Sequence, residues 1–165
     1  MRTHLIVALT LLGCAPAWAA KPSGCDKFKW PIERERAALT APDRPKLASG
    51  ADITAPAITL GLVAPSAANL PTPPERAPKD GSFAGFAALK TAPKPGVYTI
   101  SLSSAAWVDV VQDGKILKPQ AFSDAVDCDG IRKTMKYDLA ASPFVIQISG
   151  ATDSAISLAV LPANQ

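Results

Sequence analysis

The chain has 165 residues, of which 48% are hydrophobic, and its 17 Lys and Arg against 14 Asp and Glu give a formal net charge of +3. The length suits one domain with a substantial core, and we expect a monomer. The charges are interspersed, so the chain has no basic patch of the kind that binds nucleic acid. No apolar run is long enough to form a transmembrane segment.

Residues 1–19 have the pattern of a secretory signal peptide. Arg2 supplies the basic start, residues 5–12 form a short apolar run, and an Ala-Trp-Ala site favours cleavage after Ala19. A second interpretation stays open, because the Leu-Leu-Gly-Cys sequence that ends at Cys14 resembles a bacterial lipobox. We therefore expect an exported protein, either free in the periplasm or extracellular space or anchored as a lipoprotein through Cys14.

The only histidine, His4, lies inside this signal. Its removal takes away the commonest general base, the commonest neutral metal ligand and every Ser–His or Cys–His pair. We therefore expect no catalytic residue, no cofactor and a non-enzymatic role in binding or envelope support, with an envelope protein or a glycan as the partner. Two alternatives stay open: an enzyme that acts on glycans with carboxylates alone, and a purely structural protein.

Cys25 and Cys128 are the two cysteines that follow the signal. An even pair in an oxidising compartment predicts a disulfide, here between residues 103 positions apart. A redox-active pair is disfavoured, because the two cysteines do not form a C-x-x-C motif.

Proline dominates the first half of the chain, where 12 of the 16 prolines lie within residues 22–95. Proline removes a backbone donor, so we predict that residues 20–81 form an extended arm with few regular elements. Residues 31–39 predict a short helix, and residues 58–63 predict one strand with alternating apolar side chains. Residues 64–81 predict a stiff loop with polyproline character.

The second half, residues 82–165, predicts a β-sandwich core made of short strands separated by turns. Asp113-Gly114 is typical of a type I′ hairpin, and residues 119–130 predict a loop. With the strand at 58–63, the pattern predicts an all-β fold, a single antiparallel sandwich of about eight strands. The remaining strands are predicted at residues 82–89, 97–102, 106–111, 115–117, 132–139, 144–148 and 154–161. The expected core residues are Ile100, Val108, Val110, Tyr137, Ile146, Ile148, Ile156 and Leu158.

Residues 83–161 resemble the β-sandwich of bacterial pre-peptidase C-terminal (PPC) domains. The likeness is carried by a G-x-Y-x-x-x-L strand at residues 96–102, an Asp-Gly hairpin at residues 113–114 and a Tyr-x-Leu pattern at residues 137–139. It implies a jelly-roll or PPC-like sandwich. Trp107 stands where that family has the first aspartate of an Asp-x-Asp strand, so the resemblance implies no inherited metal site.

The whole chain, including residues 25–31, also resembles a set of small secreted proteobacterial proteins of unknown role. Some of these carry the name homogentisate dioxygenase, which implies iron held by histidines and a carboxylate. A chain without histidine after export cannot build that centre. We therefore reject a histidine–iron dioxygenase function.

Trp107 is the leading candidate for a binding residue. If Val108 faces the core, Trp107 and Asp109 lie together on the outer face of their strand. An exposed Trp there could stack on a sugar or anchor a partner. The alternative, which we favour, is that the N-terminal arm covers it and brings Phe28 or Trp30 close to it.

One acidic cluster, Asp124, Asp127 and Asp129, precedes Gly130. Its oxygens suit calcium in kind, but the spacing does not match the EF-hand pattern. We expect a turn stabilised by Asx side chains rather than a metal site.

Overall fold

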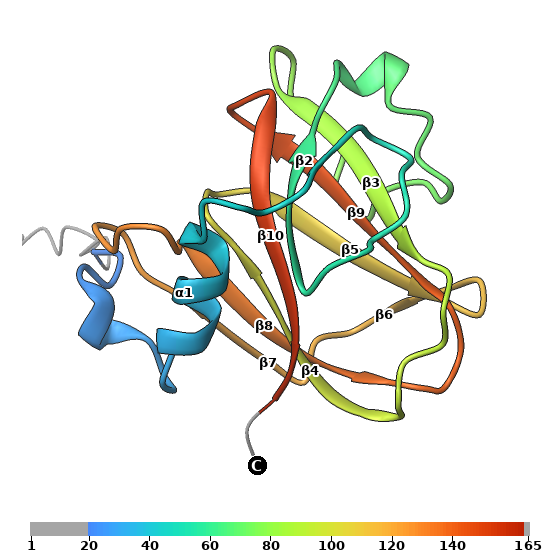
Figure 1. Cartoon of the computed structure of the whole chain (residues 1–165). Helices are drawn as coiled ribbons and strands as arrows, with labels where there is room; N and C mark the ends of the chain where they lie inside the picture. Colours follow the sequence, from blue (N-terminus) through green and yellow to red (C-terminus); the bar gives the residue numbers. More distant parts are fainter. Residues whose placement is uncertain (1–19, 164–165) are drawn as a thin grey trace, which may run out of the picture.

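The computed structural model describes residues 20–163, which form two β-sheets packed face to face with one short α-helix outside them (Figure 1). The predicted all-β sandwich is therefore confirmed, although the described residues form ten strands rather than about eight and one neighbouring pair is parallel, not antiparallel. The predictions of a signal peptide and of a lipid anchor at Cys14 fall outside the described residues. No helix within residues 20–163 is both long and apolar enough to span a bilayer.

The larger sheet has six strands in the order β1-β2-β10-β4-β8-β7. All neighbours are antiparallel except β1 and β2, which run parallel. The strands are β1 (Lys46–Leu47), β2 (Ala57–Gly61), β10 (Ala155–Pro162), β4 (Gly96–Leu102), β8 (Lys133–Leu139) and β7 (Ala121–Asp124).

The smaller sheet has four antiparallel strands in the order β3-β9-β5-β6. Asp113 and Gly114 join β5 to β6 with φ values of 51° and 73°, which is the backbone of the predicted type I′ hairpin. The strands are β3 (Phe83–Leu89), β9 (Phe144–Ala151), β5 (Trp107–Gln112) and β6 (Lys115–Leu117).

Helix α1 (Glu33–Thr40) confirms the predicted short helix, although it begins two residues after Pro31. Two single-turn 3₁₀ helices, η1 (Cys25–Lys27) and η2 (Pro65–Ala67), precede and follow it. The predicted loop at 119–130 is wrong in part, because it contains β7. That strand is short and lies at a sheet edge, so pairing with β8 stabilises it more than any pattern of its own residues.

The hydrophobic core lies between the two sheets. Every residue expected in the core is buried there: Ile100, Val108, Val110, Tyr137, Ile146, Ile148, Ile156 and Leu158. The proline-rich half adds Ile58, Leu60 and Leu62, the alternating side chains of the predicted 58–63 strand. Residues 20–81 therefore supply part of the core as well as the covering of the sandwich.

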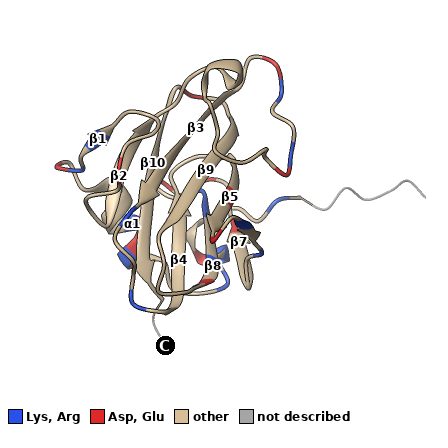
Figure 2. Ribbon diagram, turned by 90° about the vertical axis from the view of Figure 1, so that its right-hand side faces the viewer, with Lys and Arg blue, Asp and Glu red and all other residues tan. Residues whose placement is uncertain are grey.

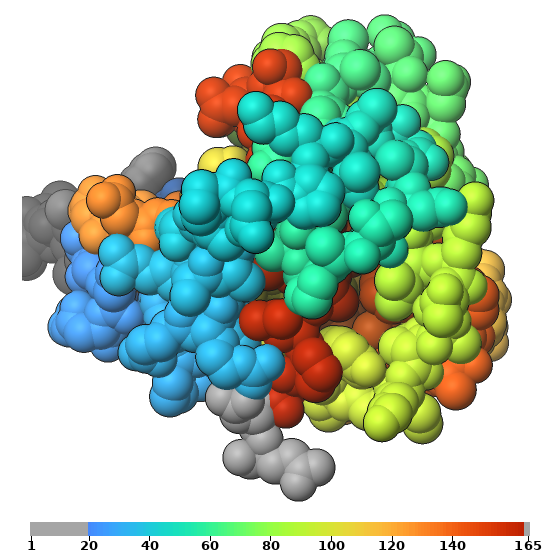
Figure 3. Space-filling model, in the orientation of Figure 1, coloured from blue at the N-terminus to red at the C-terminus, as the bar shows by residue number. Residues whose placement is uncertain are grey.

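A second, smaller apolar cluster lies outside the six-stranded sheet, where α1 packs against it. Cys25 and Cys128 form a disulfide with Cα atoms 4.8 Å apart, which confirms the predicted bond and places the protein in an oxidising compartment. In Figure 3 the N-terminal residues, coloured blue to green, spread over this side of the sandwich. The buried members of the cluster are Ile32, Leu39, Ala57, Cys128, Ile131 and Ala159.

We expect Val110→Asp to abolish cooperative folding, because Val110 is fully buried between the sheets and a carboxylate there has no partner. Val63→Asp is the matched control, since the side chain of Val63 is 38% exposed. Circular dichroism melting curves of both variants give the measurement. A cooperative transition in the Val110→Asp variant close to that of the control would contradict the assigned orientation of β5.

Reduction of the disulfide should lower the stability of the protein strongly. Closing a loop between residues 103 positions apart contributes about 4–5 kcal/mol in the chain-entropy model. A Trp107→Phe variant lacking residues 1–19 retains Trp30 as its single tryptophan, which lies beside the disulfide cluster. Its urea midpoint, followed by fluorescence, should fall on reduction. An unchanged midpoint would show that the disulfide does not stabilise the N-terminal segment. A refolded monomer in which mass spectrometry finds two free thiols would show that the bond does not form.

Candidate functional site

Trp107 and Asp109 lie on the outer face of the four-stranded sheet. Val108 and Val110 alternate with them and point into the core, as the strand pattern predicts. Trp107 is half-buried, whereas Asp109 is only 2% exposed. A buried carboxylate needs hydrogen-bond donors, and its partners show what covers this face.

The segment around Thr72 and Glu75 covers the outer face of β5 and β9. The amide group of Gln147 pairs with the backbone of Thr72 in both directions: Thr72 N–H donates to Oε1 at 2.8 Å, and Nε2 donates to the carbonyl of Thr72 at 3.0 Å. The backbone N–H of Glu75 donates to Asp109 Oδ2 at 3.2 Å. Asp109 and Gln147 are directly opposite each other on neighbouring strands, so the sheet presents them as one polar patch.

Phe28 and Trp30 do not lie near Trp107, which corrects the expectation drawn from the sequence. They pack against the cluster outside the six-stranded sheet, and the Trp30 ring lies 4.8 Å from Nζ of Lys136 on β8. Lys136 faces outward because its neighbours Met135 and Tyr137 point into the core. The disulfide holds Phe28 and Trp30 on this face, which is on the opposite side of the sandwich from Trp107. The sequence pattern does not predict against which of the two sheets Cys128 packs.

The indole of Trp107 is held on its edge and on one face. Its Nε1–H donates to Asp109 Oδ1 at 2.7 Å, and the guanidinium carbon of Arg76 lies 4.5 Å from the ring centroid. Burial raises the pKa of Asp109, and the hydrogen bonds from Trp107 and from the Glu75 backbone partly offset that rise. Asp109 thereby positions both the tryptophan and the segment that carries Arg76.

A groove of about 700 Å³ opens beside Trp107. It exists because β6 pairs only with residues 110–112 of β5, so residues 107–109 have β9 as their one neighbouring strand. Phe122 of β7 and the first residue of β8 line the groove from the other sheet. Residues 76–77, 79–82 and 149–152 complete most of its wall.

The groove has an excess of positive charge. Five cationic residues line it against two acidic ones, and Asp124 is already paired with Arg132 at 2.8 Å. Figure 2 shows the sheets largely free of charge, with Lys, Arg, Asp and Glu gathered in loops, in α1 and around β5 and β7. The cationic residues are Lys21, Arg76, Lys79, Arg132 and Lys133, and the acidic ones are Asp80 and Asp124.

Lys133 and Phe122 form the side of the groove that faces Trp107. Lys133 Nζ donates to the carbonyl of Ala106 and lies 5.6 Å from the centroid of the Phe122 ring. Burial lowers the pKa of Lys133, while the nearby Asp124 carboxylate opposes that shift. Phe122 is 41% exposed, which makes it an apolar surface open to a ligand.

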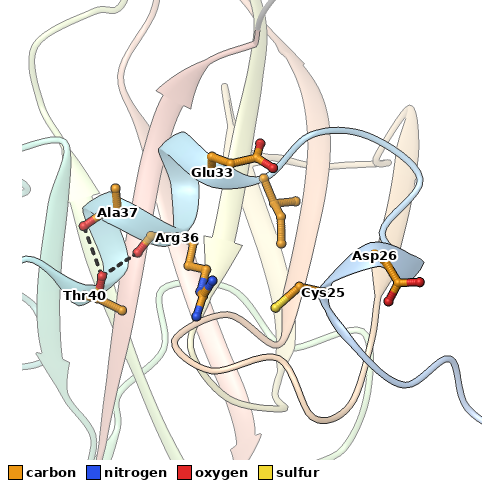
Figure 4. A pocket seen from close by; sticks show the side chains of 7 residues that line it. Cys25, Asp26, Glu33, Arg36, Ala37 and Thr40 are labelled. Atoms are coloured by element: carbon orange, nitrogen blue, oxygen red, sulfur yellow. Dashed lines mark hydrogen bonds between the residues drawn. The ribbon is translucent and has the colours of Figure 1, made fainter.

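A second hollow of about 520 Å³ lies between α1 and the disulfide (Figure 4). The side chains of Asp26, Glu33 and Arg36 point in different directions, so their charges do not converge on one point. Arg36 Nε donates to the carbonyl of Asp129 at 2.7 Å, which commits it to holding the turn before β8. This hollow is a weaker candidate than the groove beside Trp107.

The structure assigns local roles to two of the three clustered aspartates. Asp124 pairs with Arg132, and Asp127 accepts a hydrogen bond from Ser23 Oγ at 2.6 Å. Across residues 20–163, no group of three or more His, Cys, Asp and Glu side chains is placed to hold a metal ion.

Comparison with known proteins gave no match to a family model, to a curated protein or to a solved structure. The chemistry of the groove is therefore argued from the residues of this chain alone.

Of the residues predicted as a binding surface, the groove contains Trp107, and Asp109 lies directly behind it. Sequence reasoning missed Arg76 and Phe122. Arg76 lies in a proline-rich stretch, and Phe122 lies in a predicted loop, so neither had a pattern linking it to Trp107. The crossing of residues 64–82 over the sheet brings Arg76 to Trp107, and the pairing of β7 with β8 places Phe122 in the same groove.

We expect the fluorescence of Trp107 to be partly quenched by acrylamide and more fully quenched when Arg76 is replaced by Ala. A Trp30→Phe chain beginning at Ala20 has Trp107 as its single tryptophan. Lys94→Ala in the same background is the control, because Lys94 precedes β4 at the other end of the sandwich. Complete quenching already present with Arg76 intact would contradict the stacked arrangement.

Proposed function

We propose that this protein is an exported, non-enzymatic β-sandwich that binds a glycan of the cell envelope in the groove beside Trp107. The observation that carries the proposal is the groove itself, where Trp107, Arg76 and Phe122 meet. Its volume of about 700 Å³ lies within the range of about 300–1,000 Å³ typical of small-ligand sites. Aromatic rings of this kind pack against the apolar face of a sugar.

The groove is held ready for a ligand. Asp109 fixes the Trp107 edge, and Lys118 adds an ion pair to Glu75 that anchors the neighbouring segment. Side chains fixed in this way lose little conformational freedom when a ligand binds, which favours binding.

The acidic groups of the groove support binding over glycan cleavage. Glycosidases use two carboxyl groups that face each other across the scissile bond. Here Asp124 is paired with Arg132, and Asp80 is the second acidic residue of the lining. No described contact arranges these two carboxylates as an acid–base pair.

We infer that the protein acts in the periplasm or outside the cell, either free or held by a lipid on Cys14, because the disulfide requires an oxidising compartment. We also infer that the sandwich is of the jelly-roll or PPC-like kind. The turns that carry that likeness support this, since Gly96 opens β4 with φ 146° and Asp113-Gly114 forms the β5–β6 hairpin.

Binding is tested with a chain beginning at Ala20 and carrying Trp30→Phe. Peptidoglycan fragments, lipopolysaccharide core oligosaccharide and a neutral glucan are titrated in turn, with Trp107 emission and calorimetry as the readouts. We expect saturable binding of at least one glycan and about tenfold or greater weakening in Phe122→Ala, because a packed aromatic contributes on the order of 1–3 kcal/mol.

Tyr98→Ala is the control, because Tyr98 is a half-buried aromatic at the other end of β4 and should leave binding intact. New reducing ends after incubation with a glycan would instead favour the carboxylate-only enzyme. Absence of binding by every glycan would favour the purely structural role.

A further inference from the structure

We propose that the groove selects an anionic sugar, one that carries a carboxylate or phosphate group, and that Arg76 binds this group. The inference rests on the proposed function of the groove as a glycan site and adds the class of ligand. It depends on three features: unpaired cations in the wall, the orientation of Arg76, and the apolar surface of Phe122.

The first feature is an excess of positive charge in the groove wall. Within residues 20–163, the ion pairs involve neither Lys21 nor Arg76 nor Lys79. Asp124 is occupied by Arg132, which leaves Asp80 as the one lining acid outside an ion pair. An anionic ligand would gain attraction from several cations at once, whereas a neutral one would gain none.

The second feature is the way Arg76 is held. Its guanidinium carbon lies over the Trp107 ring, 4.5 Å from the ring centroid, in a cation–π contact. The N–H groups at the edge of a stacked guanidinium stay free to donate in parallel to two oxygens of a carboxylate or phosphate. Arg76 is exposed, so a ligand in the groove can reach this edge.

The third feature separates a sugar from a simple anion. Phe122 presents an apolar surface that is 41% exposed within the same groove. A sugar acid offers both an apolar ring face and a charged group on one rigid scaffold. An extended acidic peptide or a free phosphate ion lacks that ring.

The test uses trigalacturonate and its methyl ester, which have the same rings and differ in charge. We expect the acid to bind about tenfold or more tightly than the ester at low salt, because hydrogen bonds to charged groups are the stronger kind. The difference should shrink as sodium chloride is raised, because salt screens exposed charges. Competition with trigalacturonate by glucose 6-phosphate or by galacturonate shows whether the groove prefers a phosphate or a carboxylate group. Either result supports an anionic sugar as the ligand.

Arg76→Gln should remove most of the preference for the acid, because it should weaken binding of the acid far more than binding of the ester. Lys94→Gln makes the same change of charge at the opposite end of the sandwich and should preserve the preference. Circular dichroism melting curves show that each variant still folds, and the change in Trp107 emission on addition of ligand in the Trp30→Phe background shows that the ligand enters this groove.

Equal binding of acid and ester, both lost in Phe122→Ala, would overturn anion recognition and leave the groove a glycan site. Equal binding of an oligoglutamate and trigalacturonate would overturn the preference for a sugar. Failure of these probes and of every glycan in the wider panel would overturn both the anionic ligand and the proposed function.

Discussion

The structure depends on how the proline-rich residues 64–82 are held against the four-stranded sheet, although they form no strands of their own. Prolines at 71, 73 and 74 have no N–H to donate, so this stretch cannot join a strand ladder. Side chains of the sandwich hold its backbone instead: Gln147 pairs with Thr72, and Asp109 accepts from Glu75. On the opposite face the disulfide and the packing of α1 hold the N-terminal segment against the six-stranded sheet.

This covering explains why polar side chains are buried on what would otherwise be solvated faces. Thr99 donates to the buried Glu35 of α1 at 3.0 Å, and Ser123 accepts from the backbone of Lys29. Residues 50–53 also run along β3 and exchange backbone hydrogen bonds with it, which protects that edge of the smaller sheet from pairing with another chain. The N-terminal half therefore supplies hydrogen-bond partners to both sheets.

The candidate site follows from the same interactions. Asp109 serves the structure by anchoring Glu75, and it serves the groove by fixing the Trp107 ring on which Arg76 stacks. Because β6 leaves the first half of β5 with one neighbour, the groove opens at this point, and cations from residues 21, 76, 79 and 133 face it. The segment that covers the sheet is thus the same segment that carries Arg76 into the groove. A change at Asp109 would disturb both the covering and the position of Arg76.

Much of the fold is determined by the sequence itself. Alternation sets which side of a strand is buried, so the inward positions of β5, β9 and β10 were predicted correctly, and local turn chemistry predicted the Asp113-Gly114 hairpin. The disulfide was predicted because two cysteines follow the export signal and an oxidising compartment pairs them. The tertiary structure alone decided which sheet each covering segment lies on. Trp30 follows Cys25 to β8, whereas Arg76 reaches Trp107 through Asp109 and Gln147. Such contacts join residues far apart in the chain, and no spacing or periodicity encodes them.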